Sequence, residues 1–188
     1  NPILNEFNEF NLAFYLMQYL NIDETPNTAT CISYCLAHED EISTYFIGNN
    51  FLAKASELLR NDQFVSPIIT ALGNIAACSD INIDLLLKFI SYDDIIKLSL
   101  KYADDESIMN KIFRLLMNIS QRPPVPVSAF QFFIKTFNDQ PESHSKVLLY
   151  TLWCLHYSLS EPTELKNSCA EDNLIENILK LIIDERNQ

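Results

Sequence analysis

Apolar residues recur along the chain in a short helical unit. Its clearest copy covers residues 68–78 and reads IITALGNIAAC, with apolar residues at helical spacing and a single Asn inside the apolar run. A buried amide without a partner costs about 1–3 kcal/mol. Asn74 is therefore expected either to hydrogen-bond within the fold or to face a surface that binds a polar ligand.

Three further segments repeat this unit, at residues 31–37, 113–120 and 152–159. The position of Asn74 is taken in them by Cys35, Asn118 and Tyr157, so that consecutive positions are separated by 39, 44 and 39 residues. Armadillo and HEAT repeats have periods of roughly 40–47 residues. The spacing predicts an all-α helical solenoid.

The segments between the units predict two shorter helices for each long one, and three helices per repeat favour armadillo over HEAT repeats. We predict a single domain over residues 1–188, a right-handed armadillo-repeat solenoid of about four repeats. The approximate repeats are 1–24 (partial), 25–62, 63–103, 104–142 and 143–188.

Turn-forming residues predict where individual helices end. We expect a break at Asn11 between a helix ending near Phe10 and one ending at Leu20, and a helix over 174–184. Loops are expected at 23–27 and 48–50, and a rigid non-helical linker at 122–126, because Pro lacks an N–H and Gly and Asn tolerate left-handed backbone. Ser66 and Pro67 are expected to begin the helix of the second unit.

Composition excludes several classes of protein. Two glycines in 188 residues disfavour hairpin-rich β folds, and no apolar run reaches the ~18 residues of a membrane span. A net charge of −12 disfavours nucleic-acid binding and is compatible with a basic partner. Asn1-Pro2 resembles neither a signal peptide nor a natural start, so we expect the chain to be part of a longer protein.

Residue types that carry chemistry do not converge in the sequence. Cys31, Cys35 and His38 could bind a metal, but no fourth ligand and no CxxC pair accompany them, so free thiols are the better interpretation. His144 and His156 belong to no known nucleophile motif. We expect no enzymatic activity, no cofactor and no metal.

Three stretches, residues 71–76, residues 117–120 with the proline-rich run 122–126, and residues 152–162, resemble the third, fourth and fifth armadillo repeats of the importin-α family. This family carries nuclear-localisation signals as an import adaptor. The likeness is one of pattern, and it covers nearly the whole chain, from the late first to the fifth repeat.

The resemblance implies a concave groove in which Trp faces hold Lys and Arg side chains while Asn amides hold the peptide backbone. The implied peptide-binding residues are Asn74, Asn118, Trp153 and Tyr157, with Glu39 and Asp80 as acidic contacts. The implied partners are basic nuclear-localisation cargo and a receptor of the importin-β type, with no nucleic acid and no membrane. The implied location is the cytoplasm and nucleus.

The chain departs from the family pattern in the Trp positions. Cys31, Thr70 and Arg114 stand four residues before Cys35, Asn74 and Asn118, and only Trp153 remains, before Tyr157. Cys78 occupies the acidic position of the third repeat. The alternative is therefore an armadillo scaffold with a degraded signal groove that binds a dedicated protein partner. In that case the two Asn residues could bond within the solenoid, and Trp153 could serve packing.

Overall fold

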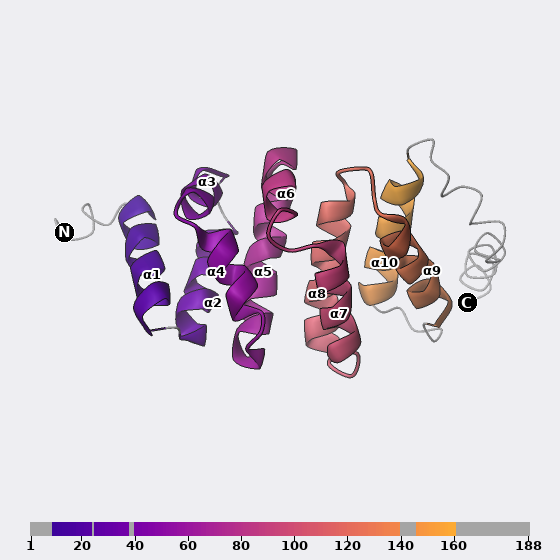
Figure 1. Ribbon diagram of the computed structural model, residues 1–188, viewed down its shortest axis with the longest axis horizontal. Helices are drawn as coiled ribbons and strands as arrows, with labels where there is room; N and C mark the ends of the chain where they lie inside the picture. The colour runs from indigo at the N-terminus through magenta and orange to yellow at the C-terminus, as the bar shows by residue number, and fades with distance from the viewer. Residues whose placement is uncertain (1–8, 24, 38–39, 140–145, 161–188) are drawn as a thin grey trace, which may run out of the picture. The chain divides into compact units, whose positions relative to one another are not determined.

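The computed structural model describes residues 9–23, 25–37, 40–139 and 146–160 (Figure 1). All regular secondary structure in these ranges is α-helical. From the N-terminus the helices are α1 (Glu9–Asp23), α2 (Pro26–Cys35), α3 (Asp40–Gly48), α4 (Phe51–Leu58), α5 (Asp62–Cys78), α6 (Asp80–Leu86), α7 (Tyr92–Lys101), α8 (Glu106–Ser120), α9 (Val127–Asp139) and α10 (Lys146–Leu159). The expected helix over 174–184 lies outside the described residues.

Contacts group the chain into two compact units, Asn1–Ile119 and Ser120–Gln188. In a solenoid each repeat contacts only its neighbours. A division of the contacts into separate groups along the chain is therefore expected. The first unit holds α1 to α7 and nearly all of α8, and the second holds α9 and α10. The single domain over 1–188 stays a prediction.

Helices in the first unit follow a regular order of two short helices and one long one. Helices α3 and α4 have nine and eight residues and precede α5 with 17. Helices α6 and α7 have seven and ten residues and precede α8 with 15. The long helix α5 packs beside α2 (Figure 1). This order is the three-helix repeat that the sequence predicts.

Apolar side chains of the long helices form the core of the first unit. Helix α5 buries almost the whole of one side, including Ile68, Ile69, Leu72 and Ile75. Burying each such side chain contributes about 1.5–3 kcal/mol. Towards its C-terminal end α5 is buried on every side, from Ala71 to Ala76, whereas Thr70 is half-buried and Ala77 is exposed.

The break expected at Asn11 is wrong, because α1 continues through it from Glu9 to Asp23. A single Asn costs a helix less than about 1 kcal/mol. Ala13, Met17 and Leu20 lie on one buried stripe of α1 and are removed from water together. Their burial outweighs the weak helix preference of Asn.

Two prolines stand inside helices rather than before them. Pro26 is the first residue of α2, where Thr25 caps the helix by accepting a 3.3 Å hydrogen bond from the Thr28 amide, so the loop expected at 23–27 is too long. Pro67 lies within α5, which begins after the Asn61 cap, so its placement in a first turn is wrong. An interior Pro costs about 3 kcal/mol, which the buried face of α5 offsets.

The other expected punctuation is confirmed. Helix α3 ends at Gly48, and Asn50 adopts the left-handed conformation with φ of 68° before α4 begins. In the second unit, residues 121–126 are not helical, as their prolines predict. Helices α9 and α10 then pack together through buried residues that include Phe130, Phe133 and Cys154.

Candidate peptide-binding faces

The positions singled out in the first unit lie at matching places on α2, α5 and α8. We call them the Asn face, defined by Cys31, Cys35, Thr70, Asn74, Arg114 and Asn118. Cys31 and Arg114 are exposed, Cys35 and Thr70 are half-buried, and both Asn side chains are buried. Helical spacing of three to four residues puts each pair on one side of its helix.

Asn74 is bonded on both sides of its amide. Its side chain is 7% exposed, and Nδ2 donates to the Ser33 carbonyl oxygen on α2 at 2.9 Å. Its Oδ1 accepts from Arg114 Nη2 on α8 at 2.7 Å. Asn74 therefore joins α2, α5 and α8 through one side chain.

Asn118 repeats half of this arrangement. Its side chain is 4% exposed, and Nδ2 donates to the Gly73 carbonyl oxygen on α5 at 2.8 Å. In each case the amide donates to a backbone carbonyl of the matching helix in the preceding repeat, α2 for Asn74 and α5 for Asn118. A role for these two residues as peptide clamps stays a prediction.

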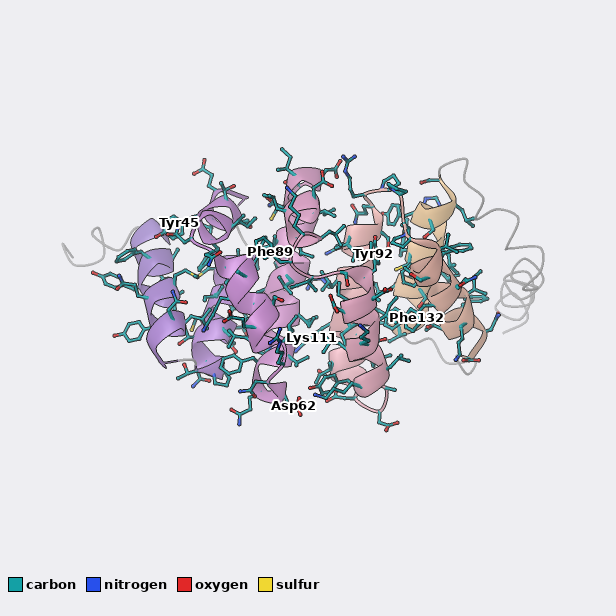
Figure 2. The ribbon with its side chains drawn as sticks, viewed as in Figure 1. Tyr45, Asp62, Phe89, Tyr92, Lys111 and Phe132 are labelled. Carbon is teal, nitrogen blue, oxygen red and sulfur yellow. The ribbon has the colours of Figure 1, made fainter. Side chains whose placement is uncertain are left out.

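Two cations of α8 extend towards α5. Lys111, labelled in Figure 2, donates from Nζ to Ser66 Oγ. Arg114 lies about one helical turn further along α8 and donates from Nη2 to Asn74 Oδ1. Arg114 is exposed and Lys111 is half-buried. Neither is within ion-pair distance of a carboxylate in the part of the chain that the structure describes. Both acceptors are neutral, so neither positive charge is balanced by its hydrogen bond.

The predicted acidic contacts are not brought to Asn74 by any described interaction. Asp80 is exposed at the first turn of α6, where Ser79 caps the helix by accepting from the Asn82 amide at 3.2 Å. Cys78 takes the acidic position and donates from Sγ to the Asn74 carbonyl oxygen at 3.2 Å. Glu39 lies outside the described residues, as do His38 and His144.

The predicted aromatic residues of the second unit lie together on α10. The rings of Trp153 and Tyr157 stack with centroids 5.7 Å apart and planes 27° from parallel. His156 meets the indole edge to face at 5.6 Å. Trp153 remains 43% exposed. These three residues form the α10 aromatic cluster.

Sequence reasoning missed a cluster at the start of α5. Asp62, labelled in Figure 2, accepts at Oδ1 a hydrogen bond from Lys101 Nζ and another, at 2.8 Å, from the Tyr102 hydroxyl. The hydrogen bond from Lys101, followed by that from Tyr102, lowers the pKa of Asp62. The partners are 39 and 40 residues apart, which is one repeat period. A search for polar pairs at that period would have found them.

Burial raises the pKa of the Cys154 thiol to about 12, against an opposing hydrogen bond with Ser120. A free thiol has a pKa of about 8.5, so the unfolded chain loses this proton first. The contribution to stability is full below about pH 8.5 and is lost as the pH rises towards about 12. Relative to Cys154→Ala, the natural chain should lose about 1–3 kcal/mol of unfolding free energy between about pH 8 and about pH 10.5.

Urea denaturation of both chains at the two pH values measures this difference, and the exposed Cys31→Ala is the matched control. Any cavity that Cys154→Ala leaves lowers the unfolding free energy equally at both pH values, so it does not affect the difference between them. Parallel losses in all three chains would contradict the assignment.

Among the described residues, no group of three or more His, Cys, Asp or Glu side chains could hold a metal ion. None of the helices in those ranges has the length and apolar character needed to cross a membrane.

Neither a protein-family model nor a curated protein matches this sequence. Solved structures do match. An engineered protein aligns with a TM-score of 0.76 at 18% identity over 89% of this chain and 70% of its own. A designed armadillo repeat protein in complex with the peptide (KR)4 aligns with a TM-score of 0.74 at 19% identity, over 89% of this chain and 73% of its own.

These likenesses bear on the fold. The helix order of the first unit, two short helices and a long one, agrees with the armadillo architecture of the matched designed protein. The chain has the all-α fold of an armadillo-repeat solenoid.

Proposed function

We propose that this chain is a non-enzymatic scaffold that binds an extended peptide along its long helices. The observation that carries the proposal is the exposed α10 aromatic cluster, where Trp153 stacks on Tyr157. An indole face attracts a Lys or Arg side chain by about 0.5–2 kcal/mol. The basic peptide (KR)4 bound by a designed protein of the same fold supports a basic ligand here.

The narrower form of the proposal is a nuclear import adaptor, which the resemblance to importin-α implies. It requires a Lys- and Arg-rich localisation signal as cargo, a receptor of the importin-β type, and a location in cytoplasm and nucleus. The net charge of −12 supports attraction of a basic peptide at long range. Salt should weaken such binding, because exposed charges are screened.

Trp153→Ala should weaken the binding of (KR)4 by roughly two- to thirtyfold, since it removes the cation–π contact. Isothermal titration gives the dissociation constants of both chains. Trp153 is the only tryptophan of the chain, so its fluorescence also reports directly whether the peptide reaches α10.

Leu149→Ala is the matched control, because Leu149 is also exposed on α10, one turn before Trp153, and has no aromatic face. Circular dichroism melting checks that both variants stay folded. Equal effects of the two substitutions, or an unchanged fluorescence spectrum, would exclude α10 as the binding platform.

The second candidate function is a scaffold for a dedicated protein partner. An exposed apolar row on α1 favours it, formed by Leu12, Tyr15 and Tyr19 at helical spacing. Large exposed apolar patches mark interaction surfaces. Two results together would support this candidate: (KR)4 fails to bind, and the double variant Tyr15→Ser, Tyr19→Ser loses a protein partner that the natural chain binds.

A further inference from the structure

We propose that Arg114 of the Asn face and the neighbouring Lys111 form an anion-binding site, which takes one Asp or Glu side chain of the bound peptide. The inference rests on the proposed peptide-binding function and refines it. The ligand would then be a peptide of mixed charge. The first unit would bind its acidic residue, and the α10 aromatic cluster would bind a basic residue.

Arg114 is held in place for this task. Its Nη2 donates to Asn74 Oδ1 at 2.7 Å, and Asn74 is itself buried and fixed by its 2.9 Å bond to the Ser33 carbonyl. A guanidinium has five N–H donors, so one bond to Asn74 leaves others for a ligand. Because its orientation is set in advance, less side-chain entropy is lost when a carboxylate binds.

Lys111 supplies a second positive charge on the same side of α8. It lies three residues before Arg114, which places the two side chains on adjacent turns of one helical face. Its ammonium group donates to Ser66 Oγ and so points towards α5 (Figure 2). Two of its three N–H donors remain.

Charge complementarity identifies the ligand. The chain has 25 Asp and Glu against 13 Lys and Arg, yet neither of these cations is ion-paired with a carboxylate among the described residues. Hydrogen bonds between a guanidinium and a carboxylate are shorter and stronger than neutral ones. Successive side chains of an extended peptide point to opposite sides, so one acidic side chain at a time can face the pair.

A Glu scan of (KR)4 tests the proposal. Each position of the peptide is replaced in turn by Glu and, separately, by Gln, and an alternating Glu-Ser peptide of equal length is included. We expect one position at which Glu binds roughly five- to thirtyfold more tightly than Gln. Arg114→Gln should remove this preference, Lys111→Gln should reduce it, and added salt should weaken it.

Arg60→Gln is the matched control, because Arg60 is an exposed arginine just after α4 and outside the Asn face. Thermal melting of each variant separates loss of binding from loss of fold. Binding of (KR)4 without any preference for Glu over Gln would overturn the inference and leave the proposed function standing. Failure of every peptide, the Glu-Ser peptide included, would overturn both.

Discussion

Phe46→Ala is expected to lower the free energy of unfolding by about 3–5 kcal/mol, the largest effect that we predict. Phe46 of α3 is fully buried, and its ring meets that of Phe51 on α4 edge to face, with centroids 5.7 Å apart. The substitution removes the buried ring, leaves a cavity and abolishes the aromatic pair, which itself contributes about 0.5–1.5 kcal/mol. Urea denaturation followed by circular dichroism measures the loss.

Phe14→Ala provides the matched control, because Phe14 of α1 is 45% exposed and the same atoms are removed. We expect its effect to be about 1 kcal/mol or less, since nearly half of the side chain that it removes is already in water. Hydrogen exchange should place the Phe46→Ala loss in α3 and α4 before other helices, because repeats depend mainly on their neighbours. Equal effects of both substitutions would contradict the assigned core.

Asn118→Ala is expected to cost about 1–3 kcal/mol of unfolding free energy, because the Gly73 carbonyl loses its buried side-chain donor. The nearly isosteric Asn118→Asp should cost at least as much, since a carboxylate oxygen would then face the carbonyl oxygen. Chemical denaturation of the two variants measures these losses.

The exposed Asn27→Ala on α2 is the control for loss of an amide without burial, and its effect should be within about 0.5 kcal/mol. If Asn118→Ala matched this control in stability and weakened (KR)4 binding instead, the amide would serve as the peptide clamp that the family resemblance implies. The two roles of the amide thus give opposite patterns of stability and affinity.

Much of the fold follows from the sequence because the apolar spacing of the long helices is repeated. The positions of Asn74, Asn118 and Tyr157 mark α5, α8 and α10, and the proline run between α8 and α9 fixes where helix cannot form. Helix starts were less predictable. Pro67 lies inside α5 because packing of the whole helix outweighs one lost hydrogen bond, and no local pattern reports that balance.

The sequence predicts where the candidate site residues lie, but not which groups their side chains contact. The sequence places Trp153 one turn before Tyr157, and the structure brings their rings together. It does not reveal that Asn74 bonds Ser33 and Arg114, because the amide can serve either a passing backbone or a neighbouring helix. Only the distance between helices decides between these two partners, and that distance depends on the packing of every repeat.

The bonds between α5 and α8 have a consequence for engineering longer arrays. On α5, Ser66 accepts a hydrogen bond from Lys111, Gly73 accepts one from Asn118, and Asn74 accepts one from Arg114. A copy of residues 75–118 inserted after Asn118 would therefore carry its own three donors. Moved by one repeat, the position of Ser66 falls on Asn110, whose buried Oδ1 has no hydrogen bond among the described residues. The duplicated lysine would donate a hydrogen bond to that oxygen. The existing helix α8 would thus already carry the acceptors that the inserted repeat needs.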